Sequence, residues 1–389
     1  MTGTGLEFVA VCDVDGTLMT SHPIPSEIRA ANRVRNFFDA RGTFMVATAQ
    51  TPEMLMSETL YLASVAAGFT RPVPLLGKRE DGSRNYIAPE TIACRRSFTD
   101  PDVIMSMGTG SYSRNGRTGP YIESGSLRSH LGWREAAYKM FALADLPSKD
   151  DPSAFLAAIE SEQNYRDGKT DVFPLPYRFQ FEFCDPIVSL EENKRRMSAV
   201  KEFIGEMADS YRWASESDRI TDAQREELIG EFKPIMDSIL IVDESRPSDN
   251  RLQFYMMPPE ASKENLIEFE LAKLAGSGTI EHLLIAGDMP PDLRAGCLAG
   301  TATHAVFVLA GGSPLVPYLS QSSNLFGIDY GSVSLQWIRD RLRPTNREGF
   351  VEFMADNRPP RTIVLGELAY PATRGPETID SFVQEFYAR

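Results

Sequence analysis

The sequence predicts an α/β protein, in which a Rossmann-like, doubly wound parallel sheet forms a core and an α+β cap domain is inserted into it. Short apolar runs rich in β-branched residues end abruptly in carboxylate, hydroxyl or glycine residues, as buried parallel strands do. Segments with helical spacing alternate with these runs near both ends of the chain, which indicates βαβ units. At 389 residues the chain exceeds one ordinary core, so two domains are expected.

The first predicted strand, residues 8–12, is followed at once by Asp13 and Asp15. The run is too short and too β-branched for a helix, and Gly16 marks the point where the chain turns. The two carboxylates would therefore lie at the carboxyl end of a central strand, where open α/β sheets bind ligands. Because neighbouring carboxylates repel each other, a divalent cation or a phosphate-handling role is the natural explanation. A simple strand-ending Asp-x-Asp-Gly turn is the alternative.

The strand–helix pattern then repeats along the chain. A helix is predicted over 25–40, because its apolar residues fall on one face and Gly42 follows it. Residues 43–48 form a second short strand that ends in Thr48, and Pro52-Glu53 has the features of another helix start. Strand, helix, strand and helix in this order open a parallel doubly wound sheet.

The middle of the chain is expected to be the cap domain, residues 111–257, so that residues 1–110 and 258–389 form the core. Residues 177–183 alternate aromatic and polar side chains, as a strand buried on one face should. A further strand, over 102–110, ends in glycines just before this block. The predicted elements of the block itself are helices over 127–143 and 190–207 and strands over 238–242 and 251–256.

After the inserted domain the first pattern returns. A helix over 263–274 precedes an apolar strand over 282–288, which ends in Asp288. The next helix, 289–296, carries Asp292 in its first turn. A further strand is predicted over 304–309 and a helix over 377–387.

Composition limits the classes of partner and compartment. A formal net charge of −14 argues against nucleic acid or an anionic membrane as the main partner, and no run of residues is long and apolar enough to span a membrane. The four cysteines are far apart and form no C-x-x-C pair, so they are expected to be buried thiols in a reducing cytoplasm.

Four motifs carry a family resemblance. They are Asp13-Val14-Asp15-Gly16-Thr17, Thr48, Lys263 in Ser262-Lys263-Glu264-Asn265-Leu266, and Gly287-Asp288-Met289-Pro290-Pro291-Asp292. In this order, and each on its expected element, they resemble the haloacid dehalogenase superfamily of phosphohydrolases. An α/β cap between the second and third motifs is similar to the sugar-phosphatase branch, and most of all to sucrose-phosphate phosphatases. Ala49-Gln50, where that family usually has Gly-Arg, and Gly311-Gly312-Ser313, where Gly-Asn-Ala is common, depart from its pattern.

The resemblance implies a Mg²⁺-dependent phosphomonoester hydrolase that acts on a small-molecule phosphate ester, here a sugar phosphate. Asp13 would attack phosphorus to form an aspartyl phosphate, and Asp15 would serve as general acid and base. Mg²⁺ would be held by Asp13, Asp288 and the backbone carbonyl of Asp15.

The remaining motif residues would bind the phosphate or support the site. The phosphate would be bound by Gly16, Thr17, Thr48 and Lys263, of which Thr48 and Lys263 count as catalytic, while Asp292 would hold Lys263 or metal-bound water.

Two alternatives remain open at this point. A phosphotransferase or phosphomutase of the same superfamily shares all four motifs and differs only in the acceptor of the phosphoryl group. A non-catalytic phosphosugar-binding protein could keep the fold, although binding alone has no need of Asp15 as a general acid. The sequence does not indicate the oligomeric state.

Overall fold

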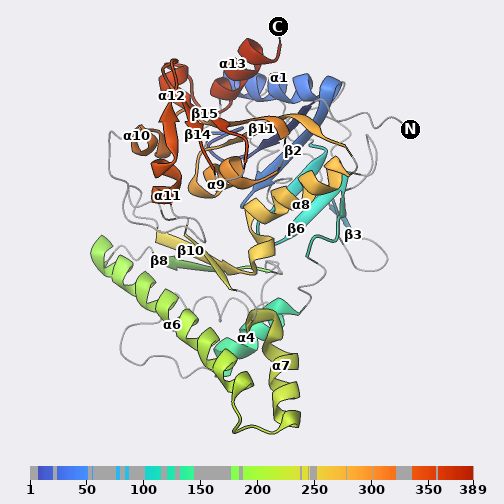
Figure 1. The fold of residues 1–389 in the computed structure, drawn as a ribbon, viewed down its shortest axis with the longest axis vertical. Helices are drawn as coiled ribbons and strands as arrows, with labels where there is room; N and C mark the ends of the chain where they lie inside the picture. The colour runs from blue at the N-terminus through green and yellow to red at the C-terminus, as the bar shows by residue number, and fades with distance from the viewer. Residues whose placement is uncertain are drawn as a thin grey trace. The chain divides into compact units, whose positions relative to one another are not determined.

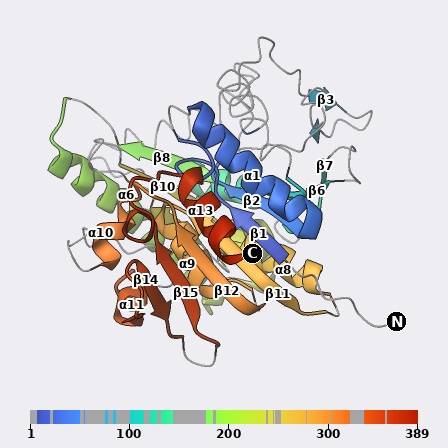
Figure 2. The ribbon, with the colours of Figure 1, turned by 90° about the horizontal axis from the view of Figure 1, so that it is seen from above.

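The structure is a computed structural model, drawn in Figures 1 and 2. It describes residues 8–20, 24–50, 55, 76–78, 84–86, 101–114, 121–127, 132–143, 177–183, 187–236, 239–243, 245, 252–276, 278–300, 302–320, 335–355 and 358–388. The chain divides into two compact units, Met1–Ser126 with Lys263–Arg389, and Leu127–Ser262.

The first unit is built on a sheet whose central strands run parallel, as predicted. Among the described residues these are, in spatial order, β15 (Arg361–Leu365), β12 (Ala302–Leu309), β11 (Ile280–Gly287), β1 (Phe8–Cys12), β2 (Gly42–Thr48) and β5 (Val103–Ser106). β1 therefore lies at the centre, between β11 and β2. The sites that follow β1, β2 and β11 must open on the same edge of the sheet.

Antiparallel strands extend this sheet on both sides. Beyond β5 lie β6 (Gly110–Arg114), β7 (Tyr121–Glu123), β4 (Arg84–Tyr86) and β3 (Leu76–Lys78), and beyond β15 lie β14 (Phe350–Phe353) and β13 (Leu342–Pro344). The predicted domain limits, 110/111 and 257/258, fall earlier in the chain than the limits of the two units. The first differs because β6 and β7 pair with the core sheet through β5, and the second because the 3-10 helix Pro259–Ala261 clusters with the second unit.

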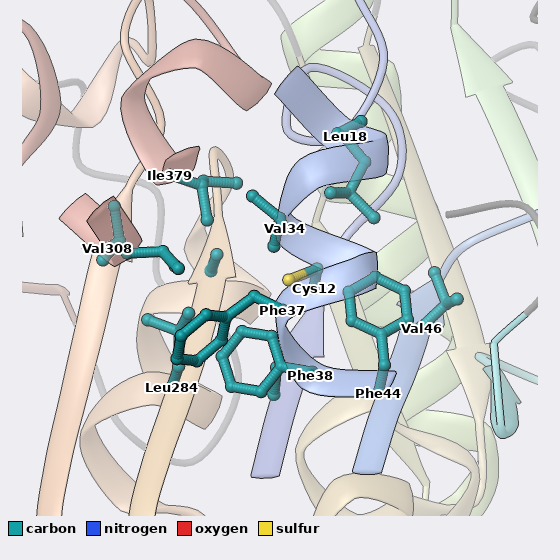
Figure 3. Close-up of a cluster of buried hydrophobic side chains, with 14 of the residues drawn as sticks. Cys12, Leu18, Val34, Phe37, Phe38, Phe44, Val46, Leu284, Val308 and Ile379 are labelled. Atoms are coloured by element: carbon teal, nitrogen blue, oxygen red, sulfur yellow. The ribbon is translucent and has the colours of Figure 1, made fainter. Parts of the chain in front are cut away.

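Helices cover both faces of the parallel sheet (Figure 1). Contacts place α1 (Pro25–Arg41) against β1 and β2 and α13 (Pro376–Phe386) against β12, whereas α8 (Lys263–Ala275) contacts β5 and α9 (Pro290–Leu298) contacts β11 and β12. Alternate strand residues divide between the faces, so the side chains of Phe8, Ala10 and Cys12 enter the cluster under α1. Figure 3 shows the labelled members of that cluster, Cys12, Leu18, Val34, Phe37, Phe38, Phe44, Val46, Leu284, Val308 and Ile379.

The C-terminal helix completes the layer that α1 begins (Figure 2). Ile379, Phe382 and Val383 of α13 are buried in the same cluster as the α1 side chains. An ion pair of 2.5 Å between Arg33 and Asp380 joins the two helices. The tail predicted as a helix over 377–387 is therefore part of the core of the first unit.

The second unit is α+β. Strands β8 (Phe179–Phe183), β10 (Leu252–Met257) and β9 (Leu240–Asp243) form an antiparallel sheet, in which the rings of Phe181 and Phe254 stack at 4.7 Å. Its described helices are α4 (Trp133–Leu143), α6 (Leu190–Glu216) and α7 (Asp222–Met236).

The predicted elements agree with the described ones over most of the chain, and two of the predicted helices differ in extent. The helix expected over 190–207 runs on to Glu216, and the one expected from residue 127 begins at Trp133. α7, the strands β13 to β15 and the short helices α10 (Leu315–Leu319), α11 (Leu335–Asp340) and α12 (Gly366–Ala369) were not predicted. The helix expected from Pro52 lies outside the described residues.

No helix among the described residues combines the length and the apolar character that a membrane span requires. Of the four cysteines, Cys12 and Cys297 are buried free thiols, and burial raises the pKa of both. Cys94 and Cys184 lie outside the described residues.

Candidate active site

Asp13 is the first residue beyond the central strand β1. Its backbone N–H donates to the carbonyl of Ala286 on β11, which continues the strand pairing by one residue and directs the chain into a tight loop. In that loop the Val14 carbonyl accepts hydrogen bonds from the N–H groups of residues 17–19. Gly16 has φ of +79°, a left-handed conformation that favours glycine. Asp13 is 5 % exposed, so its carboxylate is held inside the protein at the carboxyl edge of the sheet.

Lys263 joins two of the predicted carboxylates. Its Nζ lies 2.9 Å from Oδ1 of Asp13 and 2.7 Å from Oδ1 of Asp292, and all three side chains are buried. Lys263 is the first residue of α8, and Asp292 lies in the first turn of α9, where it also accepts the N–H of Met289 at 3.1 Å. A buried ammonium group must be paired, and here two carboxylates pair with it.

Asp288, the residue after β11, completes a cluster of three buried carboxylates. One carboxylate oxygen from each of Asp13, Asp288 and Asp292 lies within 4.8 Å of the others. The backbone carbonyl of Asp288 accepts a hydrogen bond of 2.5 Å from Ser313 Oγ, which follows β12. A Cβ at Gly16 would lie 2.3 Å from Asp288 Oδ2, so only glycine allows the loop after β1 to approach this carboxylate.

The donor set of this cluster fits Mg²⁺. Hard cations of this kind take carboxylate and carbonyl oxygens, and the cluster offers carboxylates from three separate elements. Lys263, Asp292, Asp288 and Asp15 all act electrostatically on Asp13, so this group carries four aspartates against one ammonium, an excess of three negative charges when all are ionised. A divalent cation would offset most of that excess.

The same charges act on the protonation of Asp13. Burial raises the pKa of its carboxyl group well above the ordinary value, and the Lys263 ammonium lowers it. The carboxylates of Asp292, Asp288 and Asp15 raise it further. In the absence of a cation, an ionised Asp13 is therefore a source of instability in the fold.

Gln50, which the sequence did not predict as a site residue, makes hydrogen bonds with both Asp15 and Thr48. Gln50 Nε2 lies 2.9 Å from each of the two Asp15 carboxylate oxygens. The N–H of Gln50 donates to Thr48 Oγ1 at 3.0 Å, and its carbonyl accepts from Ser106 Oγ at 2.7 Å. Because Thr48 Oγ1 accepts this bond, its own O–H proton can point elsewhere and donate to an anion.

All the predicted site residues are described, and they lie on one edge of the sheet. Asp13, Asp288, Asp292 and Lys263 are in mutual contact or within one cluster, and Asp15 and Thr48 share Gln50. Thr17 is fully buried, and its Oγ1 has no hydrogen-bond partner among the described residues. Gln50, Ser106 and Ser313 were missed as site residues. Their position at or shortly after the carboxyl end of a parallel strand was the signal that could have identified them.

Comparisons with known proteins give similarities in fold. No protein-family model matches the chain, and no curated protein matches it significantly. Sucrose-phosphatase from Synechocystis sp. PCC6803, solved with sucrose and phosphate, is 9 % identical, with 98 % of each chain covered and a TM-score of 0.45.

Two further solved structures have lower coverage. A haloacid dehalogenase-like hydrolase from Bacillus subtilis is 11 % identical, covering 79 % of this chain and 86 % of that chain at a TM-score of 0.38. Trehalose-6-phosphate phosphatase from Aspergillus fumigatus is 10 % identical, with 79 % and 84 % covered at a TM-score of 0.35. These similar structures include a member of the superfamily that the four motifs resemble.

Proposed function

We propose that this protein is a Mg²⁺-dependent phosphomonoester hydrolase that acts on a sugar phosphate through an aspartyl-phosphate intermediate. One observation carries the proposal. Asp13, a buried carboxylate, contacts Lys263 within a cluster of three buried carboxylates. Asp15, a carboxylate that can carry a proton, stands two residues after Asp13. A structural ion pair has no need of so large an excess of negative charge, whereas phosphoryl transfer needs a nucleophile, a cation and a proton donor together.

In the first half-reaction the Asp13 carboxylate attacks phosphorus in line. A bond forms between phosphorus and an Asp13 oxygen as the bond from phosphorus to the ester oxygen breaks. Protonated Asp15 gives its proton to the departing alcohol, so that no alkoxide is released. Lys263 and the Thr48 hydroxyl donate to the phosphoryl oxygens, with the backbone of Gly16 and Thr17 beside them, and Asp292 keeps Lys263 in place.

In the second half-reaction Asp15, now ionised, takes a proton from water. The water oxygen attacks the phosphorus of the aspartyl phosphate, the bond to Asp13 breaks, and inorganic phosphate leaves. Mg²⁺, when held by Asp13, Asp288 and the Asp15 backbone carbonyl, would supply positive charge against the repulsion between the phosphate and the carboxylates.

The substrate class and the compartment are parts of the same proposal. A second unit placed between Thr48 and Lys263 in the chain supports a sugar phosphate, because that position is the one that resembles the sugar-phosphatase branch. The buried free thiols Cys12 and Cys297 support a reducing compartment such as the cytoplasm.

A phosphate-release screen over sugar phosphates and nucleotides, with Mg²⁺ or with excess chelator, tests the proposal. We expect Mg²⁺-dependent release from one or more sugar phosphates, and none from the Asp13→Asn variant purified in parallel. Appearance of a new phosphorylated sugar in place of inorganic phosphate would identify a phosphotransferase instead. Full activity in excess chelator would exclude the proposed mechanism.

A further inference from the structure

Gln50 is held in place at both ends of its backbone. Its N–H is bound by Thr48 Oγ1 at the end of β2, and its carbonyl is bound by Ser106 Oγ at the end of β5. These strands are neighbours, and β2 in turn neighbours β1, from which Asp15 follows. Three adjacent strand ends are thereby joined through one glutamine. Anchoring the backbone in this way reduces the conformational freedom that the side chain must lose to make a fixed contact.

The contact of that side chain is with both oxygens of one carboxylate. Nε2 of Gln50 is equidistant from Oδ1 and Oδ2 of Asp15, at 2.9 Å each. A single donor midway between the two oxygens restricts both rotatable bonds of the aspartate side chain. Asp15 is half-buried and close enough to Asp13 to act on its charge, so without this donor electrostatic repulsion would favour other orientations of the carboxylate.

We propose that Gln50 is a positioning residue that holds the Asp15 carboxyl group where it can protonate the leaving alcohol. This inference rests on the proposed phosphatase function and adds to it. The amide supplies N–H donors without adding a charge to the site, whereas the Gly-Arg usual in the resembling family would add one. A misplacement of about 1 Å in a group that transfers a proton costs on the order of 10²-fold in rate.

The leaving group of the substrate separates this role from a merely structural one. Phenyl phosphate and 4-nitrophenyl phosphate have nearly the same shape, but only the strongly basic phenolate needs a proton as it departs. The value of kcat/KM reports the steps up to formation of the aspartyl phosphate, in which the leaving group departs. We expect Gln50→Met to lower kcat/KM about 100-fold on phenyl phosphate and less than about 5-fold on 4-nitrophenyl phosphate.

Two further variants are measured beside Gln50→Met, one as a control and one as a second test of the hydrogen bond. Gln384→Met is the matched control, because it removes an amide that donates to the Asp380 carboxylate on α13, and it should leave kcat/KM on both esters unchanged. Gln50→Glu keeps the size of the side chain but places a hydrogen-bond acceptor, instead of a donor, next to Asp15. The loss of kcat/KM on phenyl phosphate relative to 4-nitrophenyl phosphate should therefore be at least as large as in Gln50→Met. An equal loss on both esters in the Gln50 variants, or no loss, would overturn the inference.

Crystal structures of the wild-type protein and Gln50→Met give a second measurement that does not depend on activity. We expect the Asp15 carboxylate to change its orientation in the variant, and an unchanged carboxylate would overturn the inference. If the wild-type protein released phosphate from neither ester and from no sugar phosphate with Mg²⁺ present, the proposed function would fail, and the orientation of Asp15 would still decide the role of Gln50.

Discussion

Gly16 lies so close to Asp288 that a methyl group at position 16 would meet the carboxylate at 2.3 Å. Gly16→Ala should therefore displace Asp288 from the carboxylate cluster, in addition to the strain of an alanine at φ of +79°. We expect at least a 100-fold loss of phosphatase activity and a weaker affinity for Mg²⁺ by calorimetry. Gly132→Ala is the control, because Gly132 has φ of +89° with nothing within 4 Å of its Cβ position. If both variants kept their Mg²⁺ affinity, the close approach would have no role in the site.

Asp13→Asn should abolish turnover and stabilise the metal-free protein at neutral pH. Because burial raises the pKa of Asp13 above its unfolded value, the stability that its neutral form contributes is present at low pH. That contribution is lost as the pH rises through the raised folded-state pKa. Because asparagine does not ionise, the Asp13→Asn variant keeps this stability as the pH rises, and Lys263 stays paired with Asp292.

The measurement is the free energy of unfolding against pH in excess chelator. At pH 7 we expect Asp13→Asn to exceed the wild-type protein by about 1 kcal/mol or more, with a gap that closes below about pH 4. Asp209→Asn, which changes an exposed aspartate, should show no such gap. A wild-type protein more stable than Asp13→Asn at pH 7 in chelator would contradict the electrostatic account.

Asp288→Ala should raise the Mg²⁺ concentration needed for activity. The substitution removes one of the three clustered carboxylates but leaves the Lys263 pairs with Asp13 and Asp292 intact. In the wild-type protein Ca²⁺ should inhibit, because it favours a looser and higher coordination number than Mg²⁺. Titration of activity with each cation checks both expectations. An unchanged Mg²⁺ requirement in Asp288→Ala would remove Asp288 from the metal site.

Lys263→Met should destabilise the fold as well as the site. It leaves the buried carboxylates of Asp13 and Asp292 without their cation, and breaking a buried pair in this way costs about 3–5 kcal/mol. Urea unfolding in chelator at pH 7 measures the loss. Lys139→Met, at a half-exposed lysine that pairs with the half-exposed Glu231, should cost far less. Equal losses in the two variants would mean that Lys263 has no special electrostatic role.

The core of the fold could be predicted because its signals are local. The apolar runs that became β1, β2 and β11 each end in a polar residue, and α1 has a proline at its start and an apolar face. The strands β13 to β15 escaped prediction because they have three to five residues each and are flanked by prolines and charged residues. The pairing of β15 with β12, to which β14 and β13 are then added, depends on contacts distant in sequence, which no local pattern reveals.

The site residues also fall into those that local sequence signals predicted and those that they did not. Asp13, Asp15 and Asp288 follow strands directly, so the topology alone brings them to one edge. Gln50 reaches Asp15 across 35 residues by a side-chain hydrogen bond. The chain places it there only because α1 returns β2 to the side of β1. The direction of its side chain depends on the hydrogen bond that its N–H donates to Thr48 and the one that its carbonyl accepts from Ser106.

The central position of β1 has a consequence for how the protein is made. β1 ends at Cys12, whereas its neighbour β11 begins at Ile280, so about 270 residues must leave the ribosome before this pair can form. At about 5–20 residues per second that interval is on the order of 10–50 s. Throughout it one edge of an apolar strand is unpaired, and for most of it Asp13 also lacks its lysine, because Lys263 has not yet been made. Nascent chains that stop before residue 280 should therefore be aggregation-prone and dependent on chaperones, however much of the N-terminal half they contain.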